Sequence, residues 1–273
     1  MAADSKKSAN EMSFFEHIEE LRWHLMRAVI GFLVISIVIF LSKDFVFRHV
    51  ILGPTRPDFI TYQIFCDLAP SICFYPDNLQ IITRDIQEQF ISHVKVSLWL
   101  GFIFSFPYIF YEFWKFIKPG LYKNEIQAAR GMVFVCSLLF LMGASFGYFI
   151  FSPIAITFLS TYSVSPEIAN TTTLAALVNN MTMFTLPMGL IFELPVIMYF
   201  LAKVGIVSAS FLSTYRRHAV VAIVVVAAVI TPPDAISQMM VAIPLLALYE
   251  VSIVVVKRVD KERKRKEALE ETP

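Results

Sequence analysis

Residues 132–151 read MVFVCSLLFLMGASFGYFIF, and none of these side chains is charged. A helix needs roughly 20 apolar residues to cross the hydrocarbon core of a bilayer, and this run is about that long. In lipid, an open sheet edge would leave backbone amides without hydrogen bonds, so an isolated segment of this kind satisfies its backbone only as a helix. The run therefore predicts a transmembrane helix.

Five further apolar segments predict that the chain crosses the membrane six times. Their hydrophobic windows cover residues 25–41, 94–116, 181–202, 219–230 and 239–256. The composition agrees, because 57% of the residues are hydrophobic and 16% are charged, with a mean hydropathy of +0.65, whereas soluble domains are about 45–50% apolar and about 25% charged. We therefore predict an all-α membrane protein, with one transmembrane domain over residues 1–258 and a charged tail over residues 259–273.

Basic residues are distributed unevenly between the connecting segments. They gather before the first apolar segment, between the second and third, between the fourth and fifth, and after the sixth. By contrast, residues 152–180 and 231–238 contain no Lys or Arg, and residues 43–93 contain only a few. Because Lys and Arg are retained on the cytoplasmic side, both termini are expected in the cytoplasm. The region before the first segment is acidic as well as basic and no small-residue cleavage pattern follows, so we expect this segment to remain in the mature protein.

Residues 43–93 form the one long connection that is expected on the outer side. They are rich in Pro, aromatic and β-branched residues, and we expect an ordered cap that is helical near residues 83–91. Cys66 and Cys73 both fall in this connection. In an oxidising compartment they can form a disulfide, while two buried thiols are the other interpretation. Cys136, in the third apolar segment, is expected to be a small packing residue.

The first apolar segment is preceded by a helix-start motif. Residues 13–16 read SFFE, which spells a capping box with Ser13 as the N-cap. The motif predicts a helix over residues 13–24 that runs into the first span. Glu20 falls on the same side of this helix as Glu16. Acidic side chains in a first turn complement the helix dipole, which accounts for Glu16 and less well for Glu20 in the second turn.

A second motif follows the second span, where residues 116–125 read FIKPGLYKNE. Pro119 and Gly120 are expected to end the span, and Glu125 then lies near the start of the next helix. Complementing a helix dipole is again a sufficient role for Glu125 when it is taken alone.

A carboxylate interrupts the fourth apolar segment at Glu193, within the stretch IFELP over residues 191–195. A carboxylate near the bilayer centre costs about 2.5–3.5 kcal/mol, so such residues usually serve a function or face a partner. Pro195 removes a helix hydrogen bond two residues later and is expected to kink the segment. The alternative is a carboxyl group that is satisfied inside the protein's own helix bundle.

The fifth segment is short and ends abruptly at TPPD, residues 231–234. At about 1.5 Å per residue, residues 219–230 cover about 18 Å, against a hydrocarbon core of roughly 30 Å. Asp234 can cap the sixth helix, which Glu250 then interrupts. Adjacent short spans are expected to thin the bilayer locally or to draw polar groups inward.

The sequence lacks the patterns of the common catalytic and metal chemistries. It contains no HExxH, no Walker-type Gly-rich loop and no cluster of Cys and His. We therefore expect no enzymatic activity, no cofactor and no metal site, and the net charge of +1 favours no nucleic-acid partner. Two other functions stay open. One is a proton-coupled secondary transporter that uses Glu193, although the internal repeats of many transporters are not evident. The other is a membrane scaffold without a transport role.

Four stretches together resemble one family. They are residues 17–22 (HIEELR), 116–125 (FIKPGLYKNE), 192–195 (FELP) and 230–238 (ITPPDAISQ). Their order, spacing and place relative to the apolar segments resemble the TatC subunit of the twin-arginine protein translocase. The resemblance extends from about residue 13 to residue 258. It is weakest over residues 56–78, where the first loop looks expanded and carries both of its cysteines.

The resemblance implies six helices in a concave, glove-like bundle in the bacterial inner membrane. It also implies a receptor that binds folded precursor proteins by the twin-arginine motif of their signal peptides. Implied partners are single-span subunits of the TatA and TatB types, further copies of the chain itself and the lipid bilayer, with the proton-motive force as the source of energy.

The roles of individual residues come from the same resemblance. Glu20 and Glu125 would hold the two arginines, since a carboxylate accepts a bidentate bond from a guanidinium group. The rest of the signal-peptide site would consist of Leu21, Arg22, Phe116, Pro119, Leu121, Tyr122 and Lys123. Glu193 would be the intramembrane polar group on the concave side. The region of short spans where partner helices dock would include Pro232, Pro233, Asp234 and Gln238.

Overall fold

The structure is a computed structural model, and it describes residues 14–68, 73–76, 79–118, 131–163, 165, 170–231 and 235–270. Five stretches of these residues are long and apolar enough to cross a membrane. They are Ile18–Leu41 within helix α1 (Phe14–Leu41), Glu88–Ile117 as helix α4, Met132–Thr161, Leu174–Lys203, and Ser237–Arg263 within helix α12 (Ala235–Glu270). Helix α11 (Arg216–Ile230) corresponds to the fifth predicted segment and has only 15 residues.

The third and fourth spans are each built from more than one helix. The third joins α6 (Met132–Phe146), the π-helical turn η5 (Gly147–Phe151) and α7 (Ser152–Thr161). The fourth consists of α8 (Leu174–Phe192) and α9 (Leu194–Lys203), which meet at a turn at Glu193. The break that Pro195 predicts is therefore confirmed, since this proline occupies the first turn of α9, where a missing amide costs nothing.

Two boundaries differ from those expected. Residues 152–180 were expected to be an outer loop, but α7 extends to Thr161 and α8 begins at Leu174, so the connection is much shorter. In α7 the hydroxyl of Thr161 donates to the Thr157 carbonyl at 2.8 Å, which lets polar side chains continue the helix past the apolar window. At the other end of the chain, α12 passes residue 258 without a break, so the charged tail begins inside a helix.

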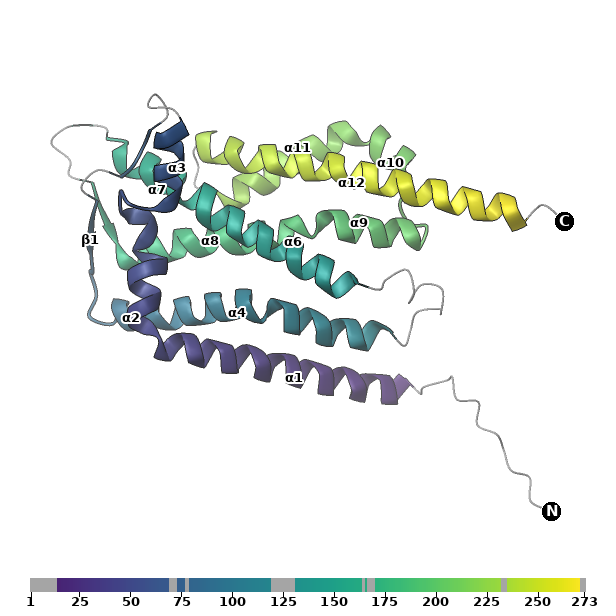
Figure 1. The fold of residues 1–273 in the computed structure, drawn as a ribbon, viewed down its shortest axis with the longest axis horizontal. Helices are drawn as coiled ribbons and strands as arrows, with labels where there is room; N and C mark the ends of the chain where they lie inside the picture. Colours follow the sequence, from purple (N-terminus) through teal and green to yellow (C-terminus); the bar gives the residue numbers. More distant parts are fainter. Residues whose placement is uncertain are drawn as a thin grey trace, which may run out of the picture.

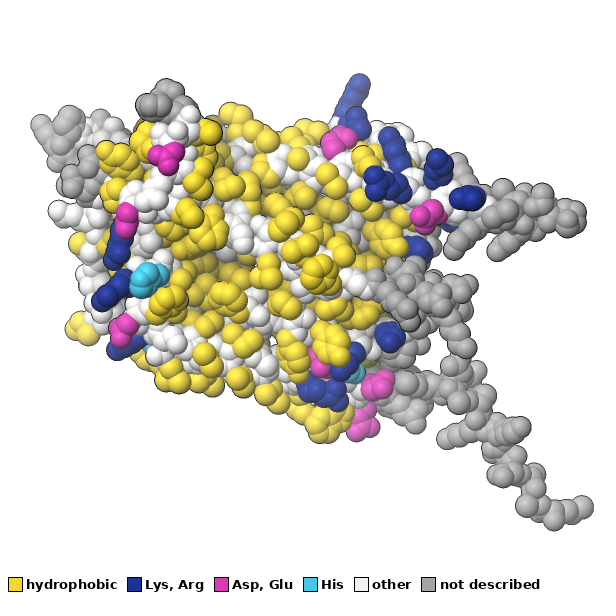
Figure 2. Space-filling model, viewed as in Figure 1, with side chains coloured by type: hydrophobic (Ala, Val, Ile, Leu, Met, Phe, Trp, Pro, Cys, Tyr) yellow, Lys and Arg dark blue, Asp and Glu magenta, His cyan; other side chains and the backbone are white. Residues whose placement is uncertain are grey.

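The helices form a layered bundle with the start of α1 and the end of α12 at the same end (Figure 1). We call this the terminal end and the opposite end the cap end. Helix α1 packs mainly on α4, α4 packs on α6 and α8, and α12 packs on α9 and α11. On the face shown in Figure 2, charged side chains gather toward the two ends and hydrophobic side chains fill the band between them. This distribution suits a protein that spans a bilayer.

Close helix contacts depend on small residues. The backbone of Gly101 in α4 touches Ser36 of α1, and a side chain at Gly101 would collide with it. A Cβ atom at Gly147 would lie 2.6 Å from the Phe184 carbonyl oxygen of α8. Because lipid tails give little hydrophobic drive for helix association, such close backbone approach is a main source of packing energy in membranes.

The described residues between 43 and 93 form an ordered structure at the cap end, as expected. It contains α2 (Lys43–Phe45), the π-helix η1 (Val46–Ile51), the 3-10 turn η2 (Gly53–Thr55) and α3 (Ile60–Leu68). Tyr62 lies at its centre with 1% of its surface exposed and donates to the Pro54 carbonyl at 2.7 Å. Burial raises the pKa of Tyr62 to about 12, while a hydrogen bond from the Thr157 hydroxyl acts in the opposite direction. The structure places the sulfur atoms of Cys66 and Cys73 at bonding distance.

The cap end also holds a small sheet that the sequence analysis did not predict. Strand β1 (Gln80–Ile82) pairs in parallel with β2 (Thr171–Thr173), so the two outer connections are hydrogen-bonded to each other. Glu88, 7% exposed, fixes the same region from the start of α4. Its carboxylate accepts the backbone amides of Arg84 at 2.6 Å and of Ala175 at 2.8 Å. It thereby satisfies an amide at the start of α8 that has no partner within the helix.

Candidate functional site

Glu112 is a buried acid at the terminal end of α4, with 3% of its surface exposed. Its Oε2 lies 2.7 Å from Nδ1 of His24 and 3.5 Å from Nη1 of Arg27, both on α1, and its Oε1 lies 3.8 Å from Nζ of Lys115. Three basic groups therefore surround one carboxylate. This cluster fastens α1 to α4, and its carboxylate is already paired.

Glu20 lies one turn before His24 on the same face of α1. Its Oε2 is buried and has no hydrogen-bond partner among the described residues. A carboxylate oxygen without a donor is costly when it is shielded from water. Of the two acids on this side of the α1–α4 pair, Glu20 is thus the one that retains capacity to accept a charged donor.

The neighbours of Glu20 in sequence point away from it. Leu21 is 40% exposed, and the guanidinium group of Arg22 lies 5.7 Å from the centre of the Trp23 ring. Residues one and two positions apart on a helix do not share a face. Leu21 and Arg22 therefore lie on other faces of α1 than Glu20, and their part in a signal-peptide site stays a prediction.

The second predicted motif is only partly described. Phe116 lies half-buried in the last turn of α4. Pro119, Leu121, Tyr122, Lys123 and Glu125 lie outside the described residues. Their roles stay predictions.

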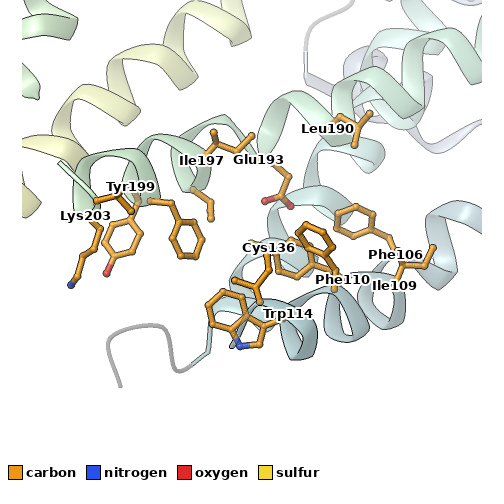
Figure 3. A pocket seen from close by; sticks show the side chains of 15 residues that line it. Phe106, Ile109, Phe110, Trp114, Cys136, Leu190, Glu193, Ile197, Tyr199 and Lys203 are labelled. Carbon is orange, nitrogen blue, oxygen red and sulfur yellow. The ribbon is translucent and has the colours of Figure 1, made fainter. Parts of the chain in front are cut away.

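An apolar groove of about 690 Å³ lies between the terminal halves of α4 and α9. Figure 3 shows aromatic side chains of α4, among them Phe110 and Trp114, on one side of the groove and residues of α9 on the other. Helix α6 contributes Cys136. The charged side chains of the lining are Glu193 and, nearer the terminal end, Lys203.

Glu193 points from the α8–α9 turn toward Cys136 and the rings of α4 (Figure 3). It is 8% exposed, the Cys136 thiol lies beside its carboxyl group, and its Oε1 makes no hydrogen bond to any described residue. An apolar groove with one under-satisfied carboxyl group fits a helix that brings a single polar side chain. Cys136 itself is 1% exposed and packs with Met132 and Val196, as expected for a packing residue.

In the short-span region, polar side chains of described residues join α11 to α12. Nε2 of Gln238 donates to the Val224 carbonyl at 3.2 Å, and Nη2 of Arg216 lies 2.9 Å from Oε2 of Glu250. Glu250, which interrupts the sixth apolar segment, is thus ion-paired with the start of α11. The 15 residues of α11 cover about 22 Å, still well below the roughly 30 Å of a hydrocarbon core. Pro232, Pro233 and Asp234 lie outside the described residues.

Sequence reasoning missed the Glu112 cluster and the Glu88 contacts. Both depend on residues about 85 positions apart or more, and no local pattern connects such residues. A usable signal for the first was the spacing of His24 and Arg27, which puts both on one face of a helix. Within the residues that the structure describes, no group of three or more His, Cys, Asp or Glu side chains is placed to hold a metal ion.

Comparisons with known proteins agree with this architecture. The family model described as Sec-independent protein translocase protein (TatC) matches residues 16–244. TatC of Blattabacterium sp. subsp. Periplaneta americana is 41% identical over 255 residues, which cover 91% of this chain and 96% of that protein. TatC of Campylobacter jejuni is 37% identical, with 92% of this chain and 98% of that protein covered.

A solved structure matches as well. A crystal structure of the twin-arginine translocase receptor TatC superposes with a TM-score of 0.70 at 32% sequence identity, over 90% of this chain and all of that one. The match confirms the predicted all-α fold with six membrane helices. The relatives are named as components of a protein translocase, which is not an enzymatic role. The chain therefore belongs to the TatC family of Sec-independent protein translocase proteins.

Proposed function

We propose that this chain is the receptor and core subunit of a twin-arginine translocase in a bacterial inner membrane. It binds the twin-arginine signal peptides of folded precursor proteins at its terminal end, which faces the cytoplasm. With TatA- and TatB-type single-span subunits and further copies of itself, it forms a complex that moves its cargo with the proton-motive force.

The observation that supports this best is the state of Glu20. Its Oε2 is shielded from water and unpaired among the described residues, while Glu112, whose partners His24 and Arg27 lie one and two turns further along α1, is surrounded by basic groups. A guanidinium group donates in a planar fork that matches a carboxylate, and it keeps its charge when buried. An arginine from another chain would supply what Glu20 lacks.

Glu125 is proposed as the second acid because a pair of arginines needs two carboxylates. It follows the end of α4 by eight residues, and α4 ends beside α1 at the terminal end. The basic residues that surround both acids in the sequence make an acidic pair there the exception. Phe116, Pro119, Leu121, Tyr122 and Lys123 would shape the same surface.

The groove beside α9 is proposed to receive an apolar helix. Its lining is aromatic and aliphatic apart from Glu193 and Lys203. It opens along the terminal halves of α4 and α9, and α4 leads toward the proposed arginine site. The apolar part of a signal peptide or a partner helix can lie along it, with one polar side chain at Glu193.

Binding of a twin-arginine precursor to membranes that contain Glu20→Gln, Glu125→Gln or both variants tests the proposal. Hydrogen bonds to charged groups are worth about 1.5–3 kcal/mol each, so each loss is expected to weaken binding roughly ten- to a hundredfold. Glu19→Gln is the matched control, because Glu19 is exposed and lies on a different face of α1. A charge-reversed precursor should regain some binding to Glu125→Lys if the contact is direct.

The outcome that contradicts the proposal is equally specific. Normal precursor binding with lowered protein abundance in both variants would mean that the acids only complement helix dipoles, which is worth about 0.3–1 kcal/mol each in stability.

A proton-coupled secondary transporter is the second candidate, and the observation that favours it is the unpaired Oε1 of Glu193 in an apolar groove. Buried acids with few partners serve as proton sites in transporters. The two candidates differ in what copurifies with the protein, which is a signal-peptide precursor in one case and a small solute in the other.

A further inference from the structure

A pocket of about 350 Å³ at the cap end combines opposite charges with an exposed apolar border. It lies where α1 gives way to α2, beside the first turn of α4 and the start of α8. Its polar side chains are Lys43, Asp44, Gln89 and His93, and Phe47 and Phe90 are among its apolar ones. We propose that this pocket binds the phosphoethanolamine headgroup of a phospholipid in the leaflet at the cap end.

The pocket lies at the level where a lipid headgroup would be found. Lys43 follows Leu41, the last residue of the first apolar span, by two positions, and Gln89 and His93 lie in the opening turns of the second span. Leu41 and Phe90 have 76% and 65% of their surfaces exposed beside it. Exposed apolar side chains at this depth face lipid, so a lipid bound here can keep its acyl chains in the bilayer.

The two opposite charges of the pocket do not neutralise each other. Among the described residues, neither Lys43 nor Asp44 makes an ion pair, although they are adjacent in sequence. A zwitterionic ligand matches this arrangement, since its phosphate can take the ammonium group of Lys43 and its own cation the carboxylate of Asp44. An anionic headgroup without a cation would meet Asp44 unfavourably.

His93 makes the pocket selective for a cation that carries N–H groups. Its ring stacks on Phe40 at 4.0 Å between centroids, and its Nε2 lies 2.9 Å from the Phe40 carbonyl oxygen. A carbonyl oxygen accepts only, so Nε2 carries the hydrogen and Nδ1 of the neutral ring is an acceptor. Nδ1 and the Gln89 amide oxygen can therefore accept hydrogen bonds from a primary ammonium group. A trimethylammonium group has no hydrogen to donate.

The test is native mass spectrometry of the full-length protein with equal amounts of phosphatidylethanolamine, phosphatidylcholine and phosphatidylglycerol. We expect phosphatidylethanolamine to be retained roughly tenfold better than phosphatidylcholine, the change expected from one charge-assisted hydrogen bond. Asp44→Asn should abolish this preference, and Lys43→Gln should reduce the retention of both zwitterionic lipids. Arg48→Gln and Asp58→Asn are matched controls in the same connection, because both residues are exposed and lie outside the pocket.

Thermal unfolding in detergent with each lipid added provides a second measurement that does not depend on ionisation in the gas phase. Phosphatidylethanolamine should stabilise the wild-type protein more than the other two lipids, and this difference should be absent in Asp44→Asn. A preference for phosphatidylglycerol that Asp44→Asn leaves intact, or equal retention of all three lipids, would overturn the proposal. Neither measurement uses a precursor, so the result is independent of the proposed receptor function.

Discussion

Nδ1 of His24 lies 2.7 Å from Oε2 of Glu112, and this contact joins the terminal ends of α1 and α4. Helix α1 packs mainly on α4 and leaves most of its apolar side chains exposed. Its position therefore depends on its contacts with α4. One is the Glu112 cluster at the terminal end, and another is the close approach of Ser36 and Gly101 deeper in the bundle.

Replacement of Glu112 by Ala is expected to destabilise the protein by about 1–3 kcal/mol, because His24 and Arg27 lose their common acceptor. Thermal unfolding in detergent measures the loss. Lys115→Gln is the control, since Lys115 is largely exposed and its 3.8 Å contact resembles a surface ion pair of at most about 1 kcal/mol. Equal losses in the two variants would argue against a special role for the contacts with α1.

Gly147→Ala is expected to cost about 1–3 kcal/mol, because the added methyl group must displace the α8 backbone at Phe184. The measurement is again thermal unfolding, together with protein abundance in the membrane. Ser145→Ala tests the same helix on an exposed face and should be close to neutral. If Gly147→Ala were as stable as the wild type, η5 and α8 could not pack as closely as described.

Glu193→Gln keeps the shape and hydrogen bonding of the side chain, whereas Glu193→Leu removes both. If Glu193 contacts a partner helix, copurification of TatA- and TatB-type subunits should be reduced less in the Gln variant than in the Leu variant. Transport of a twin-arginine precursor should follow the same order. Complete inactivity of the Gln variant with normal partner binding would instead point to an obligatory proton site.

Cys66 and Cys73 are predicted to form a disulfide on the oxidising side of the membrane. Mass mapping of unreduced peptides tests this directly. Because the bridge closes a sequence separation of only 7 residues within the cap, the double Ser variant should keep its transmembrane helices and its precursor binding. Free thiols at both positions in protein isolated without reductant would rule the disulfide out.

Reporter fusions test the predicted orientation. A reporter placed after Arg258 should be cytoplasmic, and one within residues 162–173 should lie on the other side of the membrane, because that connection contains no Lys or Arg. Three predicted spans lie between the two positions, so the two fusions should report opposite sides. The same sidedness for both would overturn the six-span topology.

The sequence predicts the membrane helices well because apolar length and charge asymmetry are local properties. The break at Glu193 is likewise local, since Pro195 cannot donate the hydrogen bond that would continue α8. The parts of helices that extend beyond the bilayer are harder to predict from the sequence. Helix α7 continues through Ser160 and Thr161, whose hydroxyl groups bond back to the helix, and a hydropathy window ends before them.

The candidate site was likewise predictable only in part from the sequence. Depth alone singled out Glu193, and position in a second turn singled out Glu20. The sequence could not tell which acids are already paired, because the partners of Glu112 lie on a helix about 85 residues away. The pairing of β1 with β2 was missed for the same reason, as each strand has only three residues and no alternation to recognise.

The length of α11 has a consequence for the lipid itself. A helix of about 22 Å in a hydrocarbon layer of roughly 30 Å compresses the surrounding acyl chains, at a cost of fractions of a kcal/mol per Å. Each short helix is surrounded by a ring of thinned lipid. When two such rings merge, their total boundary with the relaxed bilayer is smaller than when they stay apart. A second short helix is thus drawn to this flank by elastic tension before any side chains touch, and the attraction grows with the thickness of the host membrane. Contacts such as that of Gln238 with Val224 set the geometry of the flank, while the bilayer itself would supply much of the force that brings a second short helix to it.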